Sequence, residues 1–382
     1  MRILQTLLRH PARSRADLGR SLGLSRATVT ALLSELEQQG MVEQQPDETP
    51  DERRRTIGRP PLQVSLAHNA AYAVGLDLDH SHIHCAVCDL RGAVIADQWA
   101  AINVDDHPID SLDLAHRLTI RTLDEAGIAH EQVIGVGVGL AAPVDATHGS
   151  VHSQGILPRW DVIQPGVELQ ERLGLPVLIS NDANAGAMGE HLFGAGRDVA
   201  DLMYLRLSAG IGLGLILGGK PYGGFSGIAG EIGHNPAVPN GLICRCGNRG
   251  CVETVASPVA IAELLSRSRG EPVTLARMLE LVRTGDRGAC RAVADAGEVV
   301  GNAIAGAVNL LNPQLVIIGG ELAAAGRTLL EPIRAAVERS AVAPAARDVR
   351  IAQGALGESA EVLGAAALQL ARAPEALAAR LS

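Results

Sequence analysis

The stretch that decides the fold is EIGHNPAVPNGLICRCGNRGCVE, residues 231–253. It places Cys244, Cys246 and Cys251 on a glycine-rich turn, with His234 ten residues before the first of them. Three thiolates and one imidazole complete a tetrahedral set, which is typical of structural zinc and leaves no open position for a reacting water. We therefore predict a structural Zn²⁺ bound by these four side chains. The alternative is a loop that carries three reduced thiols.

Around this stretch the chain shows two similar series of strands and helices. The first series has expected strands at residues 73–79, 83–89, 93–100, 133–140 and 177–180, with a helix over 109–126. The second has expected strands at 202–207, 212–217, 315–318 and 349–352, separated by helical stretches. Short apolar runs joined by tight polar turns are typical of strands. The repetition predicts a duplicated α/β architecture with two lobes and a binding site in the cleft between them.

A polar turn, Asn181-Asp182-Ala183-Asn184, follows the last strand of the first series. Carboxylates and amides held rigidly at a strand end suit the recognition of hydroxyl groups, because each hydroxyl both donates and accepts hydrogen bonds. Taken alone, the same turn is equally compatible with a simple helix cap.

The first 40 residues indicate three short helices. Ser14 and Ser25 are good N-caps, and Gly23 separates the second helix from the third. The third helix has apolar residues at 29, 32, 33 and 36, which is the spacing of a buried stripe. Two helices joined by a short glycine-containing turn predict a helix-turn-helix, although an ordinary three-helix bundle is the alternative.

Residues 41–45 and 62–66 are expected to pair as a β-hairpin wing beside these helices. Its tip is arginine-rich, and Gly58 to Pro61 could equally be a stiff linker. Short polar or cationic side chains near the start of the third helix and arginines on the wing suit contacts with base edges, phosphates and the minor groove. The predicted DNA-binding residues are Ser25, Arg26, Ala27, Thr28, Thr30, Arg53, Arg54, Arg55 and Arg59.

Charge is distributed unevenly along the 382 residues. Residues 1–66 hold 10 arginines and 8 acidic residues, whereas the remainder holds 23 basic and 34 acidic residues, within a net charge of −9. A mildly basic head on an acidic body suits a local DNA reader on a larger sensor.

No signal peptide or membrane span is apparent, so we expect a cytoplasmic protein. Six cysteines in so long a chain do not suggest a disulfide framework, and Cys85, Cys88 and Cys290 are expected in the core.

The motifs E-x-G-H (Glu231 to His234) and C-x-C-G-x-x-G-C-x-E (Cys244 to Glu253) resemble the signature of the ROK family. That family groups sugar kinases with bacterial repressors linked to xylose, N-acetylglucosamine and glucose. The resemblance covers essentially the whole chain, including a DNA-binding head found in the repressor branch. It implies an α/β fold in which a winged helix-turn-helix (1–66) precedes a two-lobed actin/hexokinase-like (ribonuclease H-like) sugar-kinase body. The expected first lobe is 70–181 plus about 359–382, and the second, with the zinc site, is 182–358.

The resemblance also implies which residues face a sugar: Asn181, Asp182, Glu231, His234 and Glu253. In the kinases of the family, the residue matching Asp182 is the general base. His234 could direct one ring nitrogen to zinc and the other to a sugar hydroxyl. The segment Ile156 to Trp160 resembles the family's N-L-P-G-W segment, but Ile156 stands where that segment has asparagine.

The phosphate-binding turns depart from those of the family's kinases. Their D-x-G-G-T-K turn corresponds here to residues 77–82, where both glycines are missing and Asp79 and His80 stand in their place. A carboxylate about 4 Å from a phosphate oxygen costs roughly 1 to 4 kcal/mol. The second loop, residues 208–214, has lost its threonine. We therefore expect a nucleotide lobe that no longer holds ATP, and no catalytic residues.

Together these features predict a transcription regulator, most simply a repressor, whose affinity for a pseudo-palindromic operator is controlled by a sugar or sugar derivative. We expect a homodimer or homotetramer without membrane partners. Two alternatives remain open at this point. One is an active ATP-dependent sugar kinase with a DNA-binding head, and the other is a DNA-bound regulator that responds to a protein partner.

Overall fold

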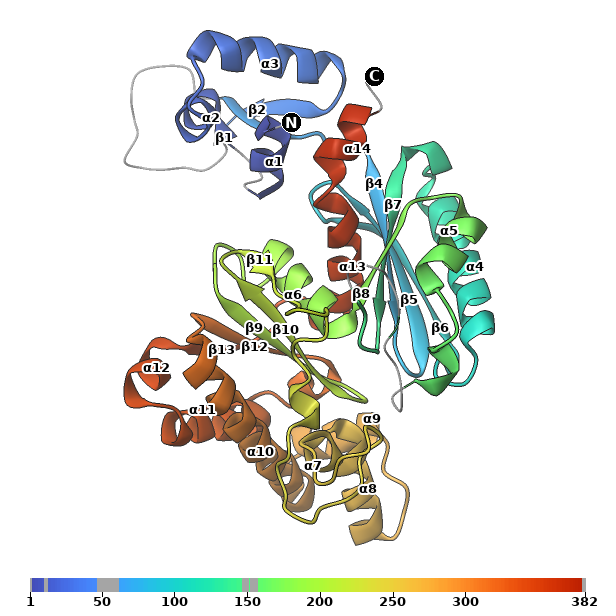
Figure 1. The fold of residues 1–382 in the computed structure, drawn as a ribbon, viewed down its shortest axis with the longest axis vertical. Helices are drawn as coiled ribbons and strands as arrows, with labels where there is room; N and C mark the ends of the chain where they lie inside the picture. The colour runs from blue at the N-terminus through green and yellow to red at the C-terminus, as the bar shows by residue number, and fades with distance from the viewer. Residues whose placement is uncertain (1, 10–12, 47–61, 146–150, 152–156, 380–382) are drawn as a thin grey trace.

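The computed structural model describes residues 2–9, 13–46, 62–145, 151 and 157–379. The chain forms a small N-terminal head and a body that contains two sheets (Figure 1). Within these residues, no helix combines the length and the apolar character needed to cross a membrane.

The head is a winged helix-turn-helix, as predicted. Its helices are α1 (Arg2–Arg9), α2 (Arg15–Leu22) and α3 (Arg26–Gln38). Its sheet has the order β1-β3-β2, with β1 (Arg13–Ser14), β2 (Val42–Pro46) and β3 (Leu62–Leu66). Both serine caps are confirmed, because Ser14 Oγ accepts from the Asp17 N–H at 3.1 Å and Ser25 Oγ accepts from the Thr28 N–H at 3.2 Å. Pairing of β2 with β3 forms the wing strands, and the tip between them lies outside the described residues.

One prediction about helix α3 of the head, the extent of its buried stripe, was wrong. Val29 and Leu33 of α3 are fully buried, but Leu32 is 37% exposed. The buried face of α3 is narrower than the predicted stripe, because the core of this small domain is small. Leu33 therefore lies within the core and Leu32 at the edge of the buried face. The two-residue strand β1 also escaped prediction, since it is too short to show an alternating pattern.

The two sheets of the body have the same topology. The first has the order β6-β5-β4-β7-β8 and the second the order β11-β10-β9-β12-β13. In each, three strands form an antiparallel meander and two further strands add in parallel. The first sheet contains β4 (Tyr72–Leu78), β5 (His82–Asp89), β6 (Val94–Ala101), β7 (Val133–Leu140) and β8 (Val177–Asn181). The second contains β9 (Leu202–Leu207), β10 (Ile211–Leu217), β11 (Lys220–Pro221), β12 (Leu315–Gly319) and β13 (Arg350–Gln353). The predicted duplication is therefore confirmed.

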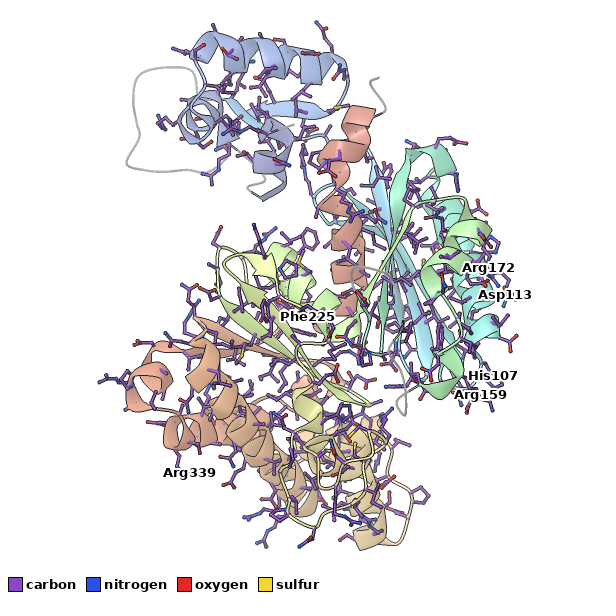
Figure 2. The ribbon with its side chains drawn as sticks, in the orientation of Figure 1. His107, Asp113, Arg159, Arg172, Phe225 and Arg339 are labelled. Atoms are coloured by element: carbon purple, nitrogen blue, oxygen red, sulfur yellow. The ribbon has the colours of Figure 1, made fainter. Side chains whose placement is uncertain are left out.

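Helices cover both faces of each sheet. On the outer face of the first sheet lie α4 (Pro108–Ala126) and α5 (Pro165–Leu173), where Arg172 Nε donates to Asp113 Oδ1 at 2.9 Å (Figure 2). The outer side of the second sheet packs on a larger helical layer. The helices of that layer are α7 (Glu253–Ala256), α8 (Pro258–Arg269), α9 (Leu275–Arg283), α10 (Arg287–Leu311), α11 (Arg327–Ser340) and α12 (Ala343–Asp348).

Two helices, α6 (Asp182–Phe193) and α13 (Ala360–Leu370), pack against each other between the sheets (Figure 1). Glycines make this contact close. A Cβ atom added at Gly75 of β4 would lie 2.0 Å from the Val362 carbonyl oxygen, and one added at Gly364 would lie 1.7 Å from the Ala185 carbonyl oxygen. The backbones of these elements are therefore in direct contact.

The head joins the body along one side. One continuous apolar cluster contains head residues such as Leu7 and Met41 together with Leu370 of α13 and Leu377 of α14 (Ala373–Ala379). Arg91, in the turn between β5 and β6, donates to the Leu66 carbonyl at 2.8 Å and pairs with Glu43 on the wing.

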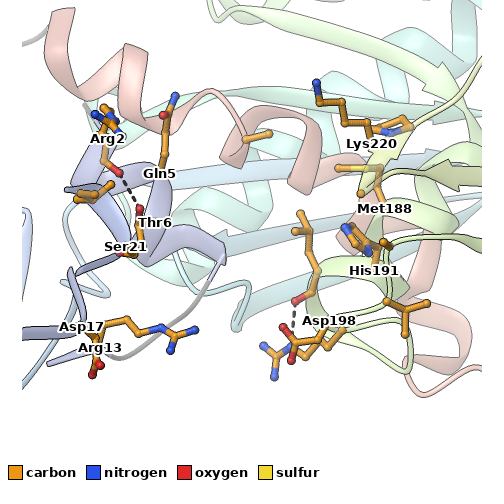
Figure 3. Close-up of a pocket in the computed structure, with 18 residues that line it drawn as sticks. Arg2, Gln5, Thr6, Arg13, Asp17, Ser21, Met188, His191, Asp198 and Lys220 are labelled. Carbon is orange, nitrogen blue, oxygen red and sulfur yellow. Dashed lines mark hydrogen bonds between the residues drawn. The ribbon is translucent and has the colours of Figure 1, made fainter. Parts of the chain in front are cut away.

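On its other side the head faces the second lobe across an open crevice (Figure 3). Residues of α1 and α2, including Arg2 and Asp17, form one wall, and residues of the body, including His191 and Lys220, form the other. The head is thus packed against α13 and α14 but separated from the second lobe by this crevice.

Candidate functional site

The five residues predicted to face a sugar line one pocket at the junction of the two lobes. They come from the end of β8, the start of α6, the segment after β11 and the start of α7, and they are Asn181, Asp182, Glu231, His234 and Glu253. Residues 141–143, 210–213 and 229–230 also line the pocket, together with His80, Arg206 and Arg245. Residues distant in the sequence therefore meet in the cleft where the duplicated fold was expected to place a site.

Asn181 and Asp182 stand where β8 ends and α6 begins. Asn181 is the N-cap of α6: its Oδ1 accepts from the Asn184 N–H at 3.2 Å, and its Nδ2 donates to the Ala142 carbonyl at 3.2 Å. The helix-cap interpretation of this turn is therefore confirmed, and Asn181 also lines the pocket, where its contact with a hydroxyl stays a prediction. Asp182 is buried, and its Oδ2 lies 2.8 Å from Arg206 Nη1.

Glu231 and Glu253 bring two more carboxylates to the pocket. Burial, with added repulsion from Asp182 and Glu253, raises the pKa of Glu231 to about 7. Glu253 is held more firmly, since its Oε2 accepts from the Ile211 N–H at 3.2 Å and its Oε1 accepts from Arg245 Nε at 3.1 Å. Two carboxyl groups in one pocket can form hydrogen bonds with several hydroxyls of one ligand.

His234 and the three cysteines of the turn come together beside the pocket. One ligand atom from each of His234, Cys244, Cys246 and Cys251 lies within 4.8 Å of the others. The His234 Nδ1 atom is 3.5 Å from Cys244 Sγ, and Cys246 Sγ is 3.8 Å from Cys251 Sγ. The other ring nitrogen, Nε2, lies 3.7 Å from Glu231 Oε2 on the pocket side.

These separations fit a tetrahedral zinc site. With Zn–S bonds of about 2.3 Å and Zn–N bonds of about 2.05 Å, tetrahedral geometry separates two sulfurs by about 3.8 Å and a sulfur from the nitrogen by about 3.5 Å. Burial and the two neighbouring thiols raise the pKa of Cys251 to about 12, so a positive ion beside this sulfur is needed to make it a thiolate. Gly250, at φ 69°, makes the turn tight, because a Cβ there would meet the Val238 carbonyl oxygen.

Arg206 is a buried pocket residue that the sequence did not predict. It lies on β9, its side chain is 6% exposed, and it pairs with three carboxylates from three other parts of the chain. These pairs are Nη2 with Asp79 Oδ2 at 2.6 Å, Nη1 with Asp182 Oδ2 at 2.8 Å and Nε with Glu361 Oε1 at 3.2 Å. The available signal was an arginine inside the otherwise apolar strand at 202–207, because a fully buried arginine almost always has acidic partners.

Arg206 also changes the interpretation of Asp79. The sequence predicts that Asp79 places a negative charge against phosphate oxygens, and the structure adds that this carboxylate pairs with Arg206. Burial alone would raise the pKa of Asp79, but Arg206 outweighs burial and lowers it to about 2. The neighbouring His80 lines the pocket with its Nδ1 atom 2.7 Å from Asp105 Oδ1. The turn after β4 is therefore occupied by a salt bridge and an imidazole instead of glycine N–H groups.

Among the predicted DNA-binding residues, those on α3 lie at its exposed N-terminal end. Ser25, Arg26, Ala27 and Thr28 are exposed, and Thr30 is half-buried. The Ser25 and Thr28 hydroxyls are 2.8 Å apart, and the Thr30 hydroxyl donates to the Arg26 carbonyl at 2.9 Å. Arg26 is thus the long side chain of this set that extends from the helix start. Arg53, Arg54, Arg55 and Arg59 lie outside the described residues, as does Ile156.

Comparison with known proteins assigns both parts of the chain. Residues 73–372 match the ROK family. The chain belongs to the ROK family. Residues 1–54 match the MarR family, in agreement with the winged helix-turn-helix of the head. The xylose repressor of Caldicellulosiruptor bescii is 28% identical over 379 residues, which cover 96% of this ROK chain and 94% of that repressor.

Solved structures of ROK proteins include both regulators and kinases. A ROK family transcriptional regulator, a homologue of the Escherichia coli Mlc protein, has a TM-score of 0.76 and 26% identity, covering 97% of this chain and 94% of its own. A ROK family glucokinase from Streptomyces griseus, solved with glucose and AMPPNP, has a TM-score of 0.71 and 29% identity. That match covers 78% of this chain and 99% of the glucokinase chain.

Proposed function

We propose that this ROK protein is a DNA-binding transcription repressor whose pocket binds a sugar, and that sugar binding weakens its hold on operator DNA. The observation that carries the proposal is the presence, in one chain, of an exposed recognition helix and a pocket lined by five polar side chains suited to hydroxyls. Similarity to a xylose repressor along nearly the full length of both chains supports the same conclusion. Operator binding would place the protein in the cytoplasm.

We further propose that the protein does not phosphorylate its ligand. Asp182 stands where the family's kinases have their general base, but both oxygens of its carboxylate are already engaged. Its Oδ2 pairs with Arg206 Nη1 at 2.8 Å, and its Oδ1 accepts from the Ala183 N–H at 2.7 Å. A base needs a free oxygen within reach of the hydroxyl proton it removes. The turn after β4 has no glycines to approach phosphates and carries a salt bridge at Asp79. Binding without phosphoryl transfer is the chemistry that this arrangement favours.

The zinc ion of this proposal is structural. His234, Cys244, Cys246 and Cys251 would occupy all four positions, so the ion would hold the turn that carries Glu231 and Glu253 to the pocket without activating water. Because a winged helix-turn-helix reads one half-site, we also propose that two or more copies of the chain assemble on a pseudo-palindromic operator.

The experiment measures DNA binding and kinase chemistry on the same full-length protein. DNA is first selected from a random library for tight binding to the chain. Its dissociation constant is then measured by fluorescence anisotropy with and without D-xylose, D-glucose or N-acetyl-D-glucosamine. In parallel, ADP formation from ATP is followed with each sugar. We expect at least one sugar to weaken DNA binding by about 5- to 150-fold and no sugar-dependent ADP formation.

A matched pair of variants tests the pocket. Asp182→Asn should abolish the sugar effect on DNA binding, whereas Asp295→Asn, a similar change on the exposed face of α10, should leave it intact. If none of the three sugars changes DNA affinity, the proposed sensor role is wrong. Sugar-dependent ADP formation would instead favour the kinase alternative, and an Asp182→Asn protein with a full sugar response would favour a site elsewhere.

A further inference from the structure

Arg206 is the meeting point of four separate elements. The arginine belongs to β9 in the second sheet, and its three partners follow β4, begin α6 and begin α13. Each of the three guanidinium nitrogens faces a different carboxylate, so every nitrogen of the arginine side chain has an acidic partner. A planar guanidinium with fixed N–H directions can satisfy several acceptors at once, which a lysine ammonium cannot do with the same geometry.

The three partners differ in their position relative to the pocket. Asp182 lines the pocket, whereas Glu361 lies outside its lining, in the first turn of α13. Glu361 is itself held, because the Tyr204 hydroxyl donates to its Oε1 atom at 2.7 Å. Arg206 therefore connects a side chain that can touch a ligand to a buried side chain on a different helix.

Helix α13 runs from this connection to the DNA-binding head (Figure 1). Its 11 residues span about 15 Å. Val362, Leu363, Ala366 and Leu370 of α13, and Ala373 and Leu377 of α14, belong to the apolar cluster that includes the core of the head. A shift of the first turn of α13 would therefore be passed to the packing around the head.

We propose that Arg206 is the positioning residue through which ligand binding at Asp182 reaches α13 and, through it, the DNA-binding head. A sugar hydroxyl that donates to Asp182 takes an acceptor that Arg206 now uses, and Arg206 then redistributes its hydrogen bonds between Asp79 and Glu361. The inference rests on the proposed function, because it requires that sugar binding changes DNA affinity. A ligand shifts such an equilibrium only by its differential affinity for the two states, and the exchange at Asp182 supplies that difference.

The decisive variant is Glu361→Gln. Glutamine keeps the acceptor for Tyr204 but removes the charge that holds Arg206 to α13, and Arg206 still faces Asp79 and Asp182. The matched control is Glu168→Gln, the same chemical change at a surface ion pair with Arg172 on α5. For the wild type and both variants we would measure the sugar dissociation constant by calorimetry and the DNA dissociation constant with and without the effective sugar of the panel above.

We expect Glu361→Gln to keep sugar binding and to lose the sugar-induced change in DNA affinity. Glu361→Gln should bind sugar within about threefold of the wild type, but the sugar-induced change in DNA affinity should fall from about 5- to 150-fold to less than about threefold. Glu168→Gln should behave as the wild type in both measurements. By linkage, DNA should alter sugar affinity by the same factor in each protein, so the loss must also be visible in the reverse titration.

A second variant, Arg206→Lys, tests the same proposal if Glu361→Gln does not fold. It keeps the positive charge but cannot contact three carboxylates in the same way, so it should also lose the response. Combining both changes should cause no further loss, because the two residues act in one connection. If either folded variant keeps the full sugar-induced change, the role of Arg206 is wrong while the repressor proposal stands. If the wild type itself shows no sugar response, both proposals fail.

Discussion

The Nη1 atom of Arg206 lies 2.8 Å from the Oδ2 atom of Asp182, so a cation on the second sheet is bound to the carboxylate that begins α6. Both side chains are almost completely buried. In the absence of Arg206, the buried carboxylates of Asp79 and Asp182 would lose the guanidinium that pairs with both. This ion pair therefore has consequences for stability that do not depend on any ligand.

Replacement of Arg206 by methionine should destabilise the protein by about 3–5 kcal/mol, because removing one partner leaves uncompensated buried charge. The free energy of unfolding in urea measures this loss. The control is Arg172→Met, which breaks the outer ion pairs with Asp113 and Glu168 and should cost less than about 1 kcal/mol. Equal losses in the two variants would contradict a special role for the buried network.

Zinc should be present at one ion per chain in the purified protein, as measured by elemental analysis. Cys246→Ser should lose the ion and lower the thermal midpoint, because a structural site contributes its binding free energy to folding. Cys290→Ser should keep the ion, since Cys290 lies on α10, away from the cluster. Retention of zinc by Cys246→Ser would show that this sulfur is not a ligand.

Acidification should destabilise the first lobe through His84. Burial lowers the pKa of His84 to about 4 although Asp97, whose Oδ2 lies 3.0 Å from Nε2, opposes the shift. Among the residues that the structure describes, the buried Nδ1 atom has no hydrogen-bond partner, so a proton added there would have no acceptor. The folded-state pKa lies below the unfolded value of about 6.5, so the stabilisation is complete above pH 6.5 and lost as the pH falls towards 4.

The expected size of this loss is about 3 kcal/mol. His84→Phe should flatten the pH dependence of the unfolding free energy between pH 4 and 6.5 while keeping the ring stacked on Trp99, whose centroid lies 3.7 Å away. His107→Gln, at an exposed position at the start of α4 (Figure 2), should retain the wild-type pH profile. An unchanged profile in His84→Phe would assign the pH dependence to other groups.

Arg26→Ala should weaken binding to the selected DNA by about 1–3 kcal/mol if the side chain reads a base, with loss of preference at one position of the site. If it contacts phosphate, binding should weaken evenly across sequences and the salt slope should fall by about 1. Arg339→Ala, on α11 of the second lobe (Figure 2), should change neither quantity. Wild-type affinity in Arg26→Ala would remove the start of α3 from the interface.

Most of the fold could be predicted from local patterns. Strands such as β4 and β7 are short apolar runs between polar turns, and the caps at Ser14 and Ser25 depend only on residues three positions away. Asn181 and Asp182 could be placed in the pocket because they follow a recognisable strand. Local signals of this kind can be recognised in the sequence without knowledge of the tertiary structure.

Arg206 could not be assigned in the same way, because its partners are far away in the sequence. Asp79 is 127 residues from it and Glu361 is 155 residues from it. Periodicity shows that residue 206 lies in a buried strand, but it does not show which acidic residues of the other lobe meet it. The same limit applies to Leu32, whose exposure depends on how much of α3 the small head can cover.

The close backbone contact between α6, α13 and the first sheet predicts an unusual distribution of harmful substitutions. Even a methyl group at Gly75 or Gly364 would overlap a carbonyl oxygen of the facing element. In a saturation library scored for repression, these two glycines should tolerate alanine no better than the four proposed zinc ligands do, although neither position lines the pocket or lies in the head. A search for residues that determine which sugar is bound should therefore exclude these glycine positions, because a substitution there would abolish repression through misfolding and not through loss of sugar binding.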